Sequence, residues 1–281
     1  VARKMPLPEN LVIIRDDPLY NLPFDMLLTR EPLQACYYPR DLPDYSDDFL
    51  LNTFSISYSP SVYFLTADRD QTRNNSILVL ANPTADEHQN SLARQRLRSQ
   101  LNWVFGSLPF SELESQSIGN LFSRQRVLKR DAASENAVKK RAPHADILHF
   151  ATHAFADTVY EAFSGVLLAR SDSTSDDGIL MGYEIETLPL NCDLVTLSAC
   201  ETGLGKVVRG EGIMSLPREF LYAGAKSVLM SFWKVDDEFT SRLMPQFYQF
   251  YRQNKVNTAN ALTLAKRQFL TNEREPSGYH A

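Results

Sequence analysis

Two stretches decide the fold of this chain: Ile147-Leu148-His149-Phe150-Ala151-Thr152-His153-Ala154 and Leu194-Val195-Thr196-Leu197-Ser198-Ala199-Cys200-Glu201-Thr202-Gly203. Each is a run of apolar and β-branched residues, typical of a buried strand, that stops at one reactive side chain. That side chain is His153 in the first stretch and Cys200 in the second. If the two strands are neighbours in a parallel sheet, both side chains emerge at its carboxyl edge, where open α/β sheets place their sites.

The rest of the chain favours the same α/β class. Besides strands at Asp146–Thr152 and Leu194–Ala199, we expect strands at Ser76–Ala81, Gly165–Leu168 and Ser227–Trp233. Helices are expected at Ala132–Arg141, Gly182–Leu188, Gly212–Ala223, Glu238–Gln253 and Thr258–Thr271, with Asp131 as N-cap of the first. Strands that alternate with helices predict a three-layer sandwich, a mostly parallel sheet with helices on both faces.

Composition and charge indicate which classes of protein this chain can belong to. The 281 residues are 43% hydrophobic, enough for a substantial core in one large domain or two small ones. A net charge of -5 disfavours a dominant role on nucleic acid or a membrane surface. The sequence shows no signal peptide and no apolar run near the roughly 18 residues that span a bilayer. Three cysteines without framework spacing, Cys36, Cys192 and Cys200, predict reduced thiols in a cytoplasmic protein.

His153 and Cys200 together predict a cysteine nucleophile with its base. The 47 residues from one to the other leave room for one βαβ-like excursion. Small neighbours, Ala199 and Gly203, suit a tight turn whose backbone N–H groups point at an oxyanion. The alternative for the thiol is a buried core residue, and for the imidazole a hydrogen-bonded structural histidine. His149, inside the apolar run, fits that structural role better.

Two other site classes match parts of these stretches less well. Gly203-Leu204-Gly205-Lys206-Val207 resembles a phosphate-binding loop, but valine replaces the required Ser or Thr and the GxxxxGK spacing is missing. His149 and His153 have the i, i+4 spacing of a zinc pair, but Phe150 stands where the metalloprotease glutamate belongs.

A basic patch lies in the middle of the chain. It comprises Lys129, Arg130, Lys139, Lys140 and Arg141. We interpret it as the solvated face of a helix, with docking of an acidic partner or RNA as the alternative.

The residues around the His/Cys pair resemble a known family. Besides the two opening stretches, the resemblance rests on Ser164–Leu168, Asp177–Leu180, Tyr183–Ile185, Gly203–Gly205, Arg209–Gly212, Phe220–Ala225 and Ser231–Asp237. These motifs, over roughly residues 145–270, are similar to the CHAT peptidases, caspase-like relatives of separase in the caspase–gingipain clan. Over 1–110 the likeness is carried by Leu22-Pro23-Phe24 and Ser57–Ser61. Such domains usually end in an aromatic, proline-containing strand, whereas this sequence reads Gly278-Tyr279-His280-Ala281.

The resemblance implies a role for each matching residue. Cys200 would be the nucleophile and His153 the general acid/base, with the backbone N–H groups of Ala154 and Cys200 as oxyanion donors. Ser198 matches a position that lines the P1 pocket, and a small neutral residue there argues against strict selection for a charged P1. Asp236 and Asp237 are candidates for an acidic wall of the substrate pocket. They are equally placed to cap the helix expected from Glu238, which is the interpretation we favour.

The family likeness implies a regulated cysteine endopeptidase that cleaves a protein partner through an acyl-thioester, without metal or other cofactor. It implies a cytoplasmic enzyme of bacterial signalling or defence. A non-catalytic caspase-like scaffold and a thiol hydrolase acting on small molecules are the alternatives. An activating partner or an additional sensor or helical-repeat domain is expected, but no membrane and no direct nucleic-acid binding. The loops Ser171–Gly178 and Gly203–Gly212 are candidate switch elements.

The domain division expected from the sequence is a leading subdomain at 1–110 and a catalytic core at 111–281. The leading part would be an inactive caspase-like half that braces the sheet. Because the sequence opens at Val1 rather than methionine, we expect a piece of a longer polypeptide.

Overall fold

The chain forms two compact units in a computed structural model. The structure describes residues 9–15, 19, 22–30, 47–66, 76–83, 108–155, 163–171, 176–198, 215–231, 235–253 and 256–274. Residues 68–245 make the large unit, and residues 1–67 with 246–281 make the small unit. This division differs from the boundary expected at residue 110, because the strand at 76–81 pairs inside the central sheet of the large unit.

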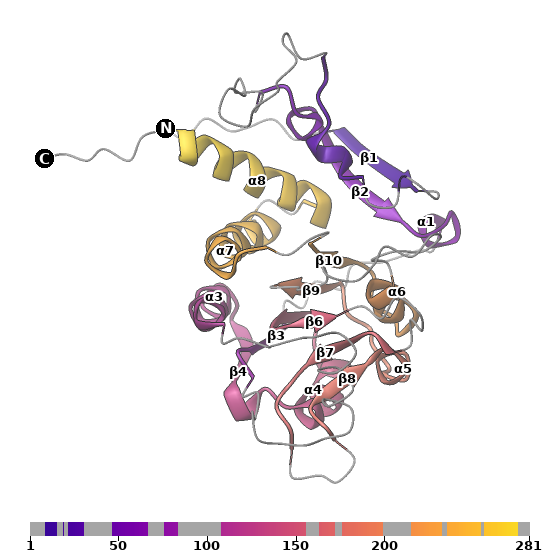
Figure 1. Cartoon of the computed structure of the whole chain (residues 1–281), viewed down its shortest axis with the longest axis vertical. Helices are drawn as coiled ribbons and strands as arrows, with labels where there is room; N and C mark the ends of the chain where they lie inside the picture. Colours follow the sequence, from indigo (N-terminus) through magenta and orange to yellow (C-terminus); the bar gives the residue numbers. More distant parts are fainter. Residues whose placement is uncertain are drawn as a thin grey trace, which may run out of the picture. The chain divides into compact units, whose positions relative to one another are not determined.

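A five-stranded parallel sheet is the centre of the large unit (Figure 1). Its order is β10 (Val228–Met230), β9 (Leu194–Ser198), β5 (Ile147–Ala151), β3 (Ser76–Ala81) and β4 (Arg124–Lys129). Every neighbouring pair in it is parallel. The prediction of a mostly parallel sheet is therefore confirmed, as is the prediction that the His153 and Cys200 stretches supply neighbouring strands.

Helices of the large unit cover both faces of this sheet. They are α3 (Pro109–Gly119), α4 (Glu135–Arg141), α5 (Gly182–Ile185) and α6 (Ser215–Tyr222). Successive side chains of a strand point to opposite faces. Leu148 and Phe150 of β5 join one apolar cluster with Val138, Ile185 and Phe220 of α4, α5 and α6. The other face of β5 carries His149, and α3 packs on β3, β4 and β5.

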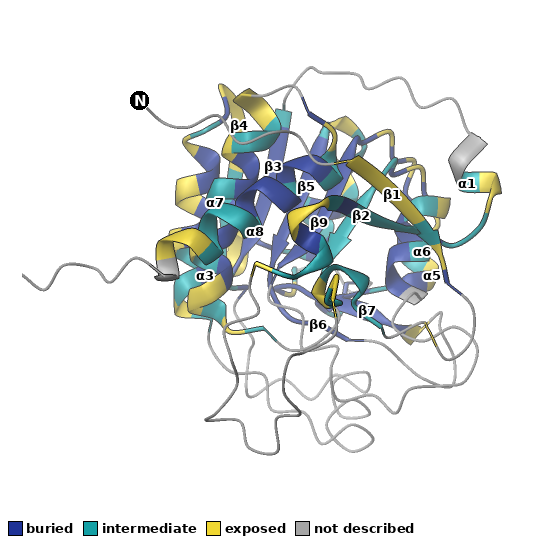
Figure 2. Ribbon diagram, turned by 90° about the horizontal axis from the view of Figure 1, so that it is seen from above, coloured by how far each residue is buried: buried dark blue, intermediate teal, exposed yellow. Residues whose placement is uncertain are grey.

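The burial pattern explains why these segments are strands. All five residues of β5 and of β9 are buried, as are all of β3 except its first residue. Near-continuous apolar sequence is what a parallel strand between two helical layers requires. Figure 2 shows these strands as buried, in contrast to the exposed β1 of the small unit.

A three-stranded antiparallel sheet follows β5 in the chain. It consists of β6 (Ala154–Phe155), β7 (Gly165–Leu167) and β8 (Ile179–Met181). The strand expected at 165–168 is therefore present, but its assignment to the parallel alternation was wrong. Only nine residues join β6 to β7 and 11 join β7 to β8, too few for the dozen or more residues of a parallel crossover.

Helix α4 begins later than expected. The side chain of Ser134 accepts a hydrogen bond from the Ala137 N–H at 3.3 Å and caps the helix at Glu135. Asp131, the expected cap, lies in a 3-10 turn at 130–132. Serine at the N-cap satisfies an N–H group that has no partner within the helix.

The small unit contains a two-stranded parallel sheet and the last helix. Strands β1 (Glu9–Ile14) and β2 (Phe54–Ser59) pair in parallel, and α8 (Thr258–Arg274) packs on β2. Arg267 Nε donates to the Leu51 carbonyl at 2.8 Å, and Lys266 Nζ contacts Asp25. The chain passes from the large unit to the small one within α7 (Asp237–Gln253), after Pro245.

Short elements complete the described chain. They are the helix α1 (Tyr63–Thr66) and the 3-10 turns η2 (Phe24–Met26), η4 (Leu50–Asn52), η5 (Arg130–Ala132) and η6 (Ala142–His144). Within the described residues, each helix is too short or too polar to cross a bilayer.

Candidate active site

The register of β5 and β9 aligns the two sequences that carry the predicted dyad. Ala151 pairs with Ser198, the last residues of the two strands. His153 follows Ala151 by two residues, and Cys200 follows Ser198 by two residues. Cys200 itself, with Ala199 and the loop Gly203–Gly212, lies outside the described residues. The structure thus defines the two strand ends and His153.

His153 is buried at the point where β5 turns into β6, with 4% of its surface exposed. Its backbone carbonyl accepts a hydrogen bond from the Leu167 N–H at 2.8 Å. The neighbouring Thr152 hydroxyl donates to the Leu167 carbonyl, also at 2.8 Å. The backbone N–H and carbonyl of Leu167 in β7 therefore hold the chain in place on both sides of the His153 side chain.

The backbone N–H of Ala154, a predicted oxyanion donor, points away from β7. Ala154 pairs with Val166 in the antiparallel ladder, one position after the His153 carbonyl that bonds Leu167. Hydrogen-bonded and non-hydrogen-bonded pairs alternate along such a ladder, so the Ala154–Val166 pair is a non-hydrogen-bonded one. The N–H of Ala154 is therefore directed away from β7, which leaves it available to an oxyanion.

His149 has the structural role expected of it. Its Nε2 lies 2.9 Å from Glu114 Oε1, and both side chains are fully buried. This contact engages the histidine that the alternative zinc pair would have required. The sequence did not identify Glu114, because its partner is 35 residues away. Only Pro109, a favoured first residue, marks the start of its helix.

Asp236 is the N-cap of α7. Its Oδ1 accepts hydrogen bonds from the N–H groups of Glu238 at 2.9 Å and Phe239 at 3.2 Å. Of the two roles considered for this residue, capping is the one seen in the structure. An acidic side chain here also complements the positive end of the helix dipole.

Asp237 makes a different contact from its neighbour. Its Oδ2 accepts from the Phe110 N–H at 2.9 Å, in the first turn of α3. Its Oδ1 is buried and has no hydrogen-bond partner among the described residues. Burial raises the pKa of this carboxyl and the charges of Glu114 and Asp236 add to the rise, while the hydrogen bond from the Phe110 N–H opposes it and His153 opposes it least.

Two serine hydroxyls lie at the same edge of the sheet. Leu197 pairs with Met230, so Ser198 and Ser231 follow side by side at the ends of β9 and β10. Both hydroxyl oxygens are buried, and neither has a hydrogen-bond partner within the described part of the chain. A buried polar group of this kind is suited to a ligand, because leaving it unsatisfied costs free energy.

Comparison with known proteins places the chain in a family. Tetratricopeptide repeat protein 28 of Homo sapiens is 23% identical over 275 residues, covering 85% of this chain and 10% of the relative. The protein of the same name in Mus musculus is 24% identical over 177 residues, covering 52% of this chain and 7% of the relative. The chain thus spans a tenth or less of the length of these relatives. The CHAT domain matches residues 1–280, and the chain therefore belongs to the CHAT domain family.

Proposed function

We propose that this chain is a regulated cysteine endopeptidase, with Cys200 as nucleophile and His153 as general acid/base. The observation that carries the proposal is the register of β5 and β9, which aligns Ala151 with Ser198. In the sequence His153 and Cys200 each follow these strand ends by two residues. The CHAT domain family, caspase-like and protease-related, agrees with this chemistry.

The reaction would proceed in two steps. The thiolate of Cys200 attacks the scissile carbonyl, and the C–N bond breaks as His153 protonates the leaving amine. Water, deprotonated by the same imidazole, then hydrolyses the thioester and releases the acid and the free thiol. The N–H groups of Ala154 and Cys200 would stabilise the oxyanion in both steps. The direction of the Ala154 N–H, away from the β6–β7 ladder, supports its part in this scheme.

We further propose that the P1 pocket accepts a basic side chain. Asp237 offers a half-buried carboxylate with one oxygen that has no partner among the described residues. Ser198 and Ser231 add hydroxyls that can bind a donor. The inference from Ser198 alone, that the pocket does not select strictly for a charged P1 residue, is the alternative.

The protein partner and the regulation are proposed from the relatives. The name of the human and mouse relatives refers to tetratricopeptide repeats, and the chain covers a tenth or less of each. We infer that a helical-repeat region joined to this domain presents the substrate or the activating signal. A cytoplasmic site of action, a role in bacterial defence and a leading portion that braces the catalytic core are proposed from the family resemblance instead, since these two relatives are human and mouse proteins.

The test is cleavage of a proteome-derived peptide library by the wild type, Cys200→Ala and His153→Ala. We expect cuts after lysine or arginine that disappear in both variants, while circular dichroism shows all three proteins folded. Lys140→Met, at an exposed position of α4, is the matched control and should cut as the wild type does.

Two outcomes would contradict the proposal. Cuts that persist in Cys200→Ala would exclude it as the nucleophile. Absence of cuts from every protein, persisting when helical-repeat partners are supplied, would favour the non-catalytic scaffold.

A further inference from the structure

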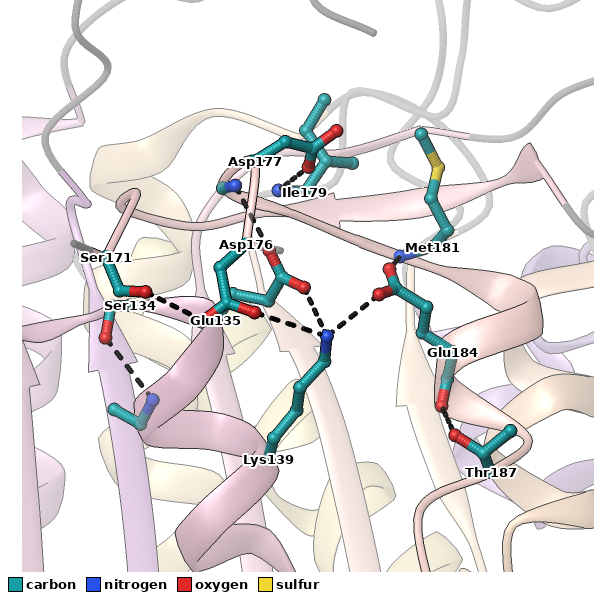
Figure 3. A network of polar contacts seen from close by, with 12 residues as sticks. Ser134, Glu135, Lys139, Ser171, Asp176, Asp177, Ile179, Met181, Glu184 and Thr187 are labelled. Carbon is teal, nitrogen blue, oxygen red and sulfur yellow. Dashed lines mark hydrogen bonds and ion pairs between the residues drawn. The ribbon is translucent and has the colours of Figure 1, made fainter. Parts of the chain in front are cut away.

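Carboxylates surround Lys139 of α4 (Figure 3). Lys139 Nζ lies 2.5 Å from Glu135 Oε1, 2.8 Å from Glu184 Oε1 and 3.5 Å from Asp176 Oδ1. Glu135 and Asp176 are buried, and the lysine side chain is 32% exposed. The interpretation of Lys139 as part of a solvated basic face was therefore wrong. We name these four residues the Lys139 cluster.

The Lys139 cluster connects α4 to both ends of the β7–β8 connection. Glu135 Oε2 accepts the Gly178 N–H at 3.1 Å, just before β8. Asp176 accepts the Ser171 hydroxyl at 2.7 Å, just after β7. Glu184 Oε2 accepts the Met181 N–H at 3.0 Å. The described ends of the loop Ser171–Gly178, a candidate switch, are thus held by charged groups.

An unbroken series of contacts leads from this cluster to His153. Glu135 holds Gly178, and the Gly178 carbonyl accepts the Leu168 N–H at 2.8 Å. The preceding residue, Leu167, donates its N–H to the His153 carbonyl at 2.8 Å. The position of the histidine backbone therefore depends on β7, and β7 is held in part by Glu135.

Helix α4 also reaches β7 through backbone hydrogen bonds. The Glu135 N–H donates to the Ala169 carbonyl at 3.2 Å, and the Ala169 N–H donates to the Ala133 carbonyl at 2.8 Å. Displacement of Glu135 would disturb both ends of the β7–β8 connection, because its backbone binds Ala169 and its side chain binds Gly178.

The charges of the cluster do not balance, since one ammonium faces three carboxylates. Burial raises the pKa of Glu135 to about 7, and repulsion from Glu184 adds to this rise, while Lys139 and the Gly178 N–H oppose it. Asp176 contributes a further negative charge at Lys139. Tyr183 of α5 also experiences this negative charge, because its pKa is raised by burial and by the charges of Glu184, Asp177 and Glu135. Glu135 therefore changes its ionisation in the neutral range.

The direction of the pH effect follows from this raised pKa. The folded protein holds the Glu135 proton more tightly than an open form, in which the carboxyl has its ordinary pKa. The stabilisation that the proton gives to the closed arrangement is complete below the ordinary range of glutamate. It is lost as the pH rises through about 7.

We propose that the Lys139 cluster is a proton-sensitive latch on β7, in which Lys139 and Glu135 are positioning residues for His153. The latch is closed while Glu135 carries its proton and loosens when this carboxyl ionises. The proposal rests on the proposed function only where it treats His153 as the catalytic base.

Amide hydrogen exchange of the full chain between pH 6 and 8 tests the latch. Protection factors, which remove the intrinsic pH dependence of exchange, are compared at Leu167, Leu168 and Gly178. In the wild type they should fall about tenfold over this range, as a pKa near 7 requires. Glu135→Gln has no proton to lose, so its protection should stay constant with pH.

Two further variants complete the test. Glu184→Gln removes a charge that raises the Glu135 pKa, so the fall should shift to lower pH while the fold is kept. Lys140→Met, next to Lys139 but exposed, should behave as the wild type. Constant protection in the wild type, or an unchanged fall in Glu135→Gln, would overturn the latch. Neither readout depends on proteolysis, so the proposed function is tested separately.

Discussion

Cys192 shows how burial suppresses the reactivity of a thiol. It is a free cysteine with no exposed surface, and burial raises its pKa to about 12. The raised value keeps the thiol protonated throughout the neutral range, and only a thiolate reacts rapidly. Iodoacetamide at pH 8 should therefore leave Cys192 unmodified in the folded protein and modify it in urea, as measured by peptide mass spectrometry. Native modification as fast as in urea would contradict this prediction.

Asp237 is expected to set the preference for a basic P1 residue. Its carboxylate must be ionised to bind lysine or arginine, and burial raises its pKa above the usual range of aspartate. The ratio of kcat/KM for an arginine substrate to that for a neutral one should therefore fall as the pH is lowered through this raised pKa. Asp237→Asn should lower the ratio about 10- to 100-fold, equivalent to a charged hydrogen bond, and remove its pH dependence. A ratio unchanged in the variant would exclude Asp237 from the pocket.

The contact of His149 with Glu114 is expected to stabilise the layer between the central sheet and α3. Both side chains are fully buried. Replacing Glu114 by alanine therefore leaves the His149 imidazole without this carboxylate partner, and solvent cannot take its place. Glu114→Ala should lower the free energy of unfolding by about 1–3 kcal/mol, measured by urea denaturation. Leu113→Ala, at an exposed position of the same helix, is the control and should change it little.

Gly224, at the end of α6, is required by the backbone. Its φ is +112°, and a Cβ at this position would lie 2.1 Å from the Leu190 carbonyl oxygen. Gly224→Ala should therefore destabilise the protein by about 2 kcal/mol or more, measured by urea denaturation. Asn120 ends α3 with an ordinary φ of −62°, so Asn120→Ala is the matched control with a loss under about 0.5 kcal/mol. Equal losses would show that neither φ nor the carbonyl matters.

Strand β7 shows which part of an element a local pattern predicts. The apolar run at 165–168 correctly indicated a strand, because burial on both faces requires apolar sequence. Its direction relative to neighbouring strands depends on hydrogen bonds to β6 and β8, which the run does not encode. The lengths of the connecting segments were the one available signal.

The whole molecule is expected not to bind nucleic acid. Its net charge is -5, and three of the five residues of the basic patch are engaged within the protein. Lys129 Nζ donates to the Glu112 carbonyl at 3.2 Å, Arg130 Nε lies 3.0 Å from Glu112 Oε1, and Lys139 is held by its cluster. Gel-shift titration with single-stranded and duplex RNA in moderate salt should show no complex. A complex weakened by Lys140→Met would instead restore the patch as a binding surface.

The sequence by itself indicated four of the five strands of the central sheet, the family resemblance and the two residues of the proposed dyad, because apolar runs and a short motif are local properties. It also marked His149 as structural, since this residue lies inside such a run. It did not predict β4, whose Arg124–Lys129 sequence is mostly polar and charged. Tertiary structure alone decided the register of Ala151 with Ser198, the contact of Glu114 with His149 and the division of the chain into two units. It likewise placed Lys139, expected on a solvated face, at the centre of an acidic cluster. These features join residues far apart in the chain, and the burial and charge that define them arise only when the chain has folded.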